Sequence, residues 1–190
     1  WILMRNHEVT RSYGLGAYAR GNAPPEAFDA SAFGGVTRVI LDAESLEVSS
    51  SNLVLTGTLK NCSGGPTPWG WLSCEENTER GHGYVFLCRK EADRVRAPER
   101  ITAYGRFVHE AVAFDPGTQI AYLTEDQPDA CFYRFVPQSP VDAFQGTLQA
   151  LRAVGAPRLA TAANLAVGQK LEVEWVDLRD TDSQKDDLRH

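Results

Sequence analysis

The 190-residue sequence lacks several features that would assign it to a common class of protein. No apolar run approaches the roughly 20 residues that a membrane-spanning helix needs, so we expect no membrane span. Lys and Arg residues number 19 and are outnumbered by 25 Asp and Glu residues. Because nucleic-acid phosphates are bound mainly by Lys and Arg, the net charge of −6 argues against a nucleic-acid partner and permits cation binding.

Common enzyme and metal signatures are also missing. The sequence contains no GxSxG elbow, no P-loop and no HExxH motif. Its four cysteines form no CxxC pair, which argues against a zinc ribbon or a thioredoxin motif but leaves a disulfide open. Cys88 and Cys131 lie in apolar strand-like runs and are predicted to be small core residues.

Methionine is scarce, and the beginning of the sequence resembles the middle of a strand. The one methionine is Met4, the first residue is Trp1, and no signal peptide is recognisable. We therefore expect the sequence to be a piece of a longer protein, truncated at both ends, with any export signal outside it.

The stretch 61–77, NCSGGPTPWGWLSCEEN, is the most distinctive part of the sequence. Its glycines and prolines exclude a helix, because proline fixes φ and donates no N–H. Trp69, Trp71 and Leu72 then indicate a short buried strand that ends at Cys74 and Glu75. Soft sulfur beside hard oxygen is unusual for packing and suits metal binding.

Short β segments separated by turns recur along the chain. Residues 107–136 predict a meander of three antiparallel strands, the first two joined by a turn at Pro116-Gly117. The segment 177–190 is strongly charged and is predicted to be a tail or a connection between blades. Strands are predicted at 1–4, 36–42, 46–59, 69–72, 83–88, 107–115, 120–126, 131–136 and 171–176.

The sequence also contains a weak internal repeat. Residues 71–75 match residues 122–126 at an offset of 51: aromatic, leucine, small hydroxyl, ligand-type residue, carboxylate. A repeat near 50 residues made of short antiparallel strands is typical of propeller blades. We predict an all-β fold in which 1–190 form one partial β-propeller domain of about three blades, with units at 1–60, 61–105 and 106–176.

Carboxylates recur at the predicted strand ends. Glu8, Glu75 and Glu125 each lie at such an end, and Glu110 lies on the first strand of the meander. The inner strands of a propeller line a central channel, where carboxylates from successive blades would repel one another unless cations lay between them. Oxygen ligands suit Ca²⁺, whereas a thiolate suits a transition metal such as iron.

Structural roles remain open for several of these residues. Glu76 and Glu79 are predicted to form a solvated loop face, and Glu8 and Glu125 suit a surface strand end as well as a ligand. Without its neighbour Glu75, Cys74 would be predicted to be a buried thiol.

The histidines give weaker signals. His109 is predicted to orient Glu110 instead of binding a metal itself. His82 lies between two glycines and is predicted to be a turn residue.

Three motifs resemble the PhoX-type alkaline phosphatases of bacteria. Residues 61–76 resemble the signature stretch of that family, which usually reads close to NCAGGPTPWGTWLTCEE. Residues 105–126, GRFVHEAVAFDPGTQIAYLTED, and the following CFYRFVP resemble its next block, and RNHE at 5–8 resembles its NHE block. One residue is missing between Gly70 and Trp71 relative to the family pattern, and such a change within a strand reverses the faces of the side chains.

The resemblance implies a six-bladed propeller that is exported folded to the periplasm or secreted. It implies hydrolysis of small phosphomonoesters by a cluster of Fe³⁺ and Ca²⁺ ions in the channel. His109 and Asp126 are expected to support the ligands. The implied metal ligands are Glu8, Cys74, Glu75, Glu110 and Glu125.

The resemblance also sets limits and leaves alternatives. Later parts of the family have no counterpart in these 190 residues, so the site is expected to be incomplete and this chain alone inactive. The full-length protein is expected to be monomeric. The alternatives are a non-catalytic calcium-binding propeller and a phosphodiesterase or lactonase on the same fold.

Overall fold

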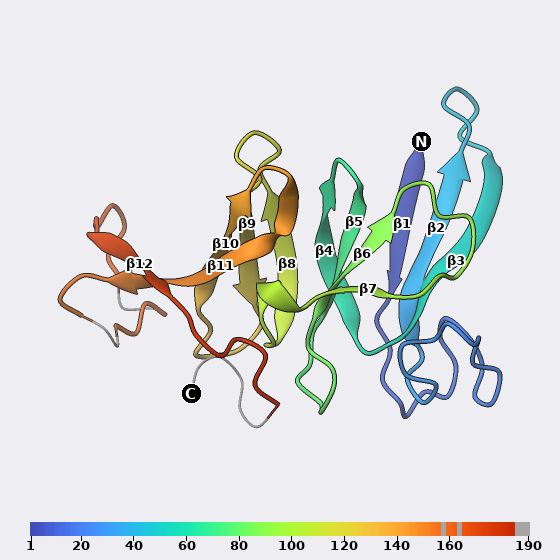
Figure 1. Cartoon of the computed structure of the whole chain (residues 1–190), viewed down its shortest axis with the longest axis horizontal. Helices are drawn as coiled ribbons and strands as arrows, with labels where there is room; N and C mark the ends of the chain where they lie inside the picture. Colours follow the sequence, from blue (N-terminus) through green and yellow to red (C-terminus); the bar gives the residue numbers. More distant parts are fainter. Residues whose placement is uncertain (157–158, 163–164, 185–190) are drawn as a thin grey trace.

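Three antiparallel β-sheets stand side by side along the longest axis of the molecule (Figure 1). The structure, a computed structural model, describes residues 1–156, 159–162 and 165–184. Within these ranges the only helical element is a single 3-10 turn, η1 (Thr102–Tyr104). No helix in the described part of the chain has the length and apolar character to cross a membrane. The prediction of an all-β chain is confirmed.

Each sheet is made of strands that follow one another in the sequence. The first sheet contains β1 (Ile2–His7), β2 (Gly34–Leu41) and β3 (Val48–Thr58). The second contains β4 (Asn61–Thr67), β5 (Gly70–Glu75), β6 (Val85–Arg89) and β7 (Glu99–Ile101). The third contains β8 (His109–Phe114), β9 (Ala121–Glu125), β10 (Phe132–Ser139), β11 (Asp142–Ala153) and β12 (Val173–Asp177).

The second sheet is packed on both faces, and the alternation of side chains along β6 shows this directly. Phe86 and Cys88 belong to the core shared with the first sheet, whereas Val85 and Leu87 belong to the core shared with the third. Successive side chains of a strand point to opposite faces, so β6 contributes to both cores. The second sheet is therefore the middle layer of the molecule.

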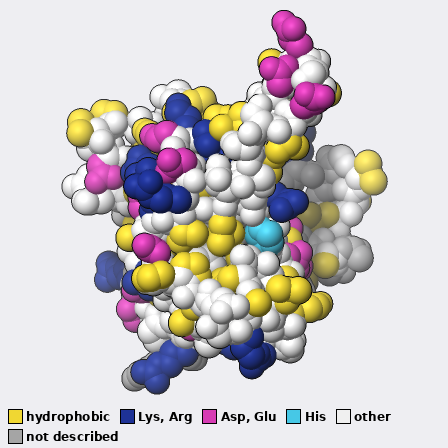
Figure 2. Space-filling view, turned by 90° about the vertical axis from the view of Figure 1, so that its right-hand side faces the viewer, with side chains coloured by type: hydrophobic (Ala, Val, Ile, Leu, Met, Phe, Trp, Pro, Cys, Tyr) yellow, Lys and Arg dark blue, Asp and Glu magenta, His cyan; other side chains and the backbone are white. Residues whose placement is uncertain are grey.

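The outer face of the first sheet lies at the surface. Met4 on β1 packs toward the second sheet, whereas its neighbour Leu3 is 49% exposed. Figure 2, which turns this side of the molecule toward the viewer, shows hydrophobic side chains gathered across its middle.

The strands β1, β4 and β8 bring the three sheets together along one side. Strand β4 contacts both β8 and β1, so the first strand of each sheet faces that of its neighbour. Sheets that meet along their first strands are typical of propeller blades. The chain is thus part of a β-propeller, as predicted.

Several elements differ from the sequence-based prediction. Strand β4 includes Gly64-Gly65-Pro66, which was expected to be a non-helical entry to the next strand, and β7 lies in a stretch predicted to be a charged connection. No strand was predicted over most of β11, and β12 pairs with β11 instead of beginning another sheet. Cys131 is exposed, so the prediction that it is a core residue is wrong, whereas Cys88 is buried as predicted.

Close backbone packing explains why glycine is used inside β4. A Cβ atom on Gly65 would lie 1.8 Å from the carbonyl oxygen of Val112 on β8. No side chain fits in that space, so the two strands approach with their main chains in contact.

Candidate metal centre

Three strand ends bring carboxylates to one edge of the molecule. Strands β1, β5 and β9 run toward the same edge (Figure 1), and the first residue after each of these strands is acidic. These residues are Glu8, Glu76 and Asp126. Because neighbouring sheets meet at this edge, the three carboxylates form a row across the molecule.

Bulges in two first strands place further ligand-type side chains between these carboxylates. In the pairing of β4 with β5, Asn61 lies opposite Glu75 and Gly64 opposite Ser73, so the two residues Cys62 and Ser63 share one partner, Cys74. A β-bulge of this kind changes the direction of the bulged side chains. The thiol of Cys62 is therefore directed away from the regular face of its strand.

The third sheet repeats this geometry. In the pairing of β8 with β9, His109 lies opposite Glu125 and Val112 opposite Leu123, so Glu110 and Ala111 share Thr124. Glu110 thus occupies in β8 the position that Cys62 occupies in β4.

A pair of backbone hydrogen bonds confirms the equivalence of the two strand ends. The Glu76 N–H donates to the Lys60 carbonyl at 2.9 Å, and the Asp126 N–H donates to the Val108 carbonyl at 3.1 Å. Lys60 and Val108 each lie two residues before the bulged side chain. Glu76 and Asp126 are therefore fixed in the same way beside the first strands of their sheets.

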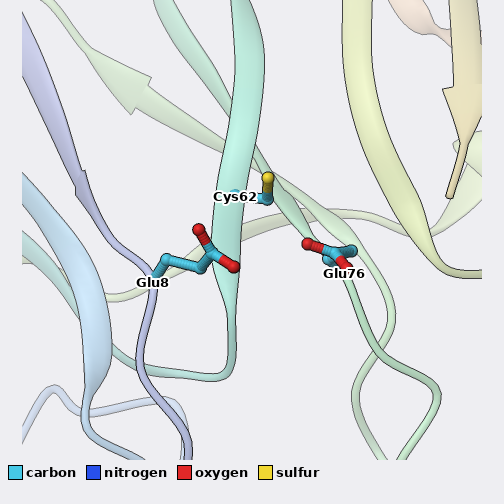
Figure 3. Close-up of side chains that lie close together, drawn as sticks. All are labelled: Glu8, Cys62 and Glu76. Carbon is cyan, nitrogen blue, oxygen red and sulfur yellow. The ribbon is translucent and has the colours of Figure 1, made fainter.

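The first ligand group consists of Glu8, Cys62 and Glu76. One ligand atom from each residue lies within 4.8 Å of the other two. Figure 3 shows Glu8 and Glu76 on either side of Cys62. One thiol and two carboxylates from three separate segments thus converge on one point.

The second ligand group consists of Glu76, Glu110 and Asp126, whose ligand atoms also lie within 4.8 Å of one another. Glu76 belongs to both groups, and its side chain is only 13% exposed. The Cys62 Sγ lies 3.5 Å from a Glu110 oxygen, which connects the groups a second time. The two groups therefore form one continuous cluster.

The cluster carries an excess of negative charge. Lys60 contributes one ammonium group, which lies 2.9 Å from Glu76, against four carboxylates. Burial works to raise the pKa of Glu76, but hydrogen bonds from Lys60 and Cys62 outweigh it and leave that pKa lowered. The remaining acidic groups favour cations between them.

The environment of Cys62 keeps its thiol protonated when no cation is bound. Burial, followed by hydrogen bonding and charge from neighbours such as Glu110 and Glu76, raises the pKa of Cys62 to about 12. A bound metal reverses this preference, because a coordinating thiol is deprotonated. The donor set therefore fits a cation cluster of thiolate and carboxylate ligands.

Two residues expected to be ligands lie behind the cluster, at equivalent positions. Glu75 is fully buried, and its oxygens accept hydrogen bonds from the N–H groups of Leu59, Gly83 and Tyr84 at 2.8–3.2 Å. Glu125 is 8% exposed and accepts from the Cys131 N–H and the Tyr133 hydroxyl. Neither residue belongs to a ligand group.

The other expected residues are divided between the core and the cluster. Cys74 is fully buried in the core between the second and third sheets, where burial raises the pKa of its thiol well above the usual value. His109 is also fully buried, its Nε2 lies 3.0 Å from the Gly105 carbonyl, and burial lowers its pKa to about 3. Asp126, expected to support the ligands, lies in the second group together with Glu110.

Cys62 and Glu76 are the two cluster residues that sequence reasoning missed. Cys62 was in the signature stretch but was given no role, and Glu76 was assigned to a solvated loop. A signal for both residues was present in the sequence. Glu76 precedes Asp126 by 50 residues and Cys62 precedes Glu110 by 48, whereas the repeat was aligned on its aromatic residues at an offset of 51.

A solved structure resembles this chain in fold. A solved structure entitled Pseudomonas fluorescens PhoX in complex with vanadate, a transition state analogue, matches this chain with a TM-score of 0.56 and 18% sequence identity. The match covers 80% of this chain and 42% of that chain, so this chain spans less than half the length of its structural relative. No curated protein matches the sequence.

The family comparison covers most of the chain. The family model described as alkaline phosphatase PhoX matches residues 36–189, a range that includes all the cluster residues except Glu8. The chain belongs to the PhoX alkaline phosphatase family.

Proposed function

We propose that the protein hydrolyses phosphomonoesters with cations held along the row of strand ends. The observation that carries this proposal is the sharing of Glu76 between two ligand groups, which makes one cluster from two sheet junctions. Adjacent cation sites are common where phosphoryl groups are transferred. The proposed ligands are Glu8, Cys62, Glu76, Glu110 and Asp126.

The two groups suit different ions. The thiol of Cys62 gives the first group a soft ligand, which favours a transition metal such as Fe³⁺. The second group offers carboxylates alone, which favours Ca²⁺. We therefore assign iron to the first group and calcium to the second.

The residues of the chain have distinct tasks in this proposal. Cys62 gives up its proton when it becomes a ligand, and Lys60 offsets part of the negative charge that an approaching phosphate meets. When bound, the cations supply Lewis-acid stabilisation of charge on the phosphoryl group. The vanadate complex of the P. fluorescens protein supports phosphoryl-transfer chemistry, because vanadate, like phosphate, is an oxyanion.

Some sequence-based expectations do not enter the proposed ligand set. Cys74, Glu75 and Glu125 remain predicted ligands without support from the geometry, because their side chains lie in the core or bind backbone N–H groups. A six-bladed full-length propeller, its monomeric state and its location in the periplasm or outside the cell also remain predictions.

The test is hydrolysis of p-nitrophenyl phosphate by the full-length protein, together with elemental analysis. We expect hydrolysis that a chelator abolishes, and both iron and calcium in the purified protein. Hydrolysis that is unaffected by complete removal of metals would contradict the proposal. Calcium without iron and without hydrolysis would support a calcium-binding propeller instead.

A further inference from the structure

Four titratable side chains form a connected network directly behind the first ligand group. His82 is 2% exposed, and its Nδ1 lies 2.7 Å from Oε1 of the fully buried Glu75. Its Nε2 lies 3.2 Å from an oxygen of Asp29. Arg11 forms an ion pair with Asp29 at 2.8 Å. Arg11 and Asp29 belong to the long connection between β1 and β2, so the network joins the first two sheets.

Hydrogen-bond chemistry fixes the roles within this network. Both oxygens of Glu75 accept hydrogen bonds from backbone N–H groups, so the Nδ1 of His82 acts as a further donor to this carboxylate. Glu75 thereby receives a fourth donor in addition to the N–H groups of Leu59, Gly83 and Tyr84. A buried carboxylate with four donors is held in a single orientation.

Contacts from Glu75 lead to each ligand of the first group. Glu76 is its neighbour in sequence. The Leu59 N–H that Glu75 binds lies three residues before Cys62. The Lys60 N–H between them donates to the Val9 carbonyl at 3.0 Å, which fixes the segment that carries Glu8.

The equivalent carboxylate of the third sheet is supported differently. Glu125 accepts from the Cys131 N–H, as Glu75 accepts from the Tyr84 N–H, but its side-chain donor is the Tyr133 hydroxyl. The histidine network therefore lies behind the thiol-containing group.

We propose that Glu75 and His82 are positioning residues that hold Glu8, Cys62 and Glu76 at the spacing of a thiolate-ligated cation. This inference rests on the proposed function and assigns Glu75 a role other than the ligand role implied by the family resemblance. Supporting residues of this kind change metal affinity by about 10–100-fold when they are removed.

The test uses two substitutions that preserve different nitrogens of His82. In His82→Asn the amide nitrogen lies at the distance of Nδ1 from the backbone, and in His82→Gln it lies at the distance of Nε2. The probe is Co²⁺ added to the metal-free full-length protein, read from the absorption of the thiolate-to-Co²⁺ charge-transfer band. Thermal unfolding of each variant measures the purely structural effect.

H82N is expected to retain Co²⁺ affinity within about threefold, because it retains the bond to Glu75, whereas H82Q is expected to lose about tenfold or more. Equal affinities, or equal losses of affinity and melting temperature in both variants, would overturn the positioning role. If H82Q does not fold, Asp29→Asn replaces it, with a loss of about threefold expected and no change overturning the proposal. A wild-type protein without the charge-transfer band would instead overturn the thiol-containing site itself.

Discussion

The two ligand groups are built from the same strand positions but differ in the ligand type at the bulge, a thiol or a carboxylate, and in what lies behind them. The first has Cys62 at the bulge and a histidine network behind Glu75; the second has Glu110 at the bulge and a tyrosine behind Glu125. The repeated sheet thus supplies the geometry, and single residues adapt it. The difference teaches that the type of ligand atom at a group can change while the fold around it stays the same.

Removing the residue common to both groups should have the largest effect. Glu76→Gln takes a charged ligand from each group, so we expect loss of both metals and a fall in phosphatase activity of more than about a hundredfold. Elemental analysis and the p-nitrophenyl phosphate assay check this. Glu44→Gln, in the exposed turn between β2 and β3, is the control and should change neither. Loss of only one metal would show that the groups are independent.

Making the groups alike should have the next largest effect. Cys62→Glu gives the first group the same carboxylate that the second has, so calcium should replace iron and activity should fall by about tenfold to a hundredfold.

Cys74→Ala is the matched control for that substitution. This variant should keep its iron and lose about 1 kcal/mol of unfolding free energy, because Cys74 is buried in the core. Loss of iron in Cys74→Ala with iron retained in Cys62→Glu would reverse the assignment.

The stabilisation that His82 contributes behind the first ligand group should depend on pH. Burial works to lower the pKa of His82, but hydrogen bonding and charge from Glu75 outweigh it, so the pKa lies above 6.5. A raised pKa means that His82 contributes its full stabilisation below about pH 6.5 and loses it as the pH rises through the folded-state value.

The pKa of Asp29 is shifted in the opposite direction. Burial works to raise it, but hydrogen bonds from Ser31, Arg11 and His82 hold it well below its usual 3.8. Its stabilisation is present above about pH 3.8 and is lost as the pH falls through the lower folded-state value.

Urea unfolding from about pH 4 to about pH 9 tests the pH dependence of the His82 contribution. The excess unfolding free energy of the wild-type protein over His82→Gln should shrink toward high pH. An advantage that is constant with pH would contradict a raised pKa of His82.

Removing the ion pairs on the outer strands of the second and third sheets should have the smallest effect on stability. Arg89 pairs with Glu99 across β6 and β7, and Arg152 pairs with Glu174 across β11 and β12. All four side chains are 44–47% exposed, so Glu99→Gln and Glu174→Gln should each change the unfolding free energy by less than about 1 kcal/mol. A larger loss of unfolding free energy in one of the two variants would show that the ion pair at the edge of that sheet contributes more than an exposed pair usually does.

The fold was largely predictable from the sequence because its strands follow alternation and turn chemistry. The meander β8–β9–β10 was predicted from the apolar runs on either side of Pro116-Gly117. Strand β4 was not, because its Gly-Gly-Pro composition disfavours strands in general, and only the contact of Gly65 with Val112 explains it.

The sequence predicted the location of the candidate site but not the register of the strands that carry it. Aligning the two sheets by aromatic residues equated Cys74 with Glu125, whereas the hydrogen-bond register equates Glu75 with Glu125. A one-residue shift reverses every side chain in a strand, and Cys74, which the family resemblance implies to be a ligand, packs in the core. The bulges at Cys62 and Glu110 follow from pairing between strands, and the offset of 48 between these two residues is their one trace in the sequence.

The contact between Gly65 and Val112 has a consequence for how such a protein can evolve. Since main chain touches main chain there, the separation of the two bulges does not depend on the size of any side chain. Mutations can then accumulate in the surrounding cores, and ligands can be exchanged at either bulge, while the spacing between the two ligand groups is inherited unchanged.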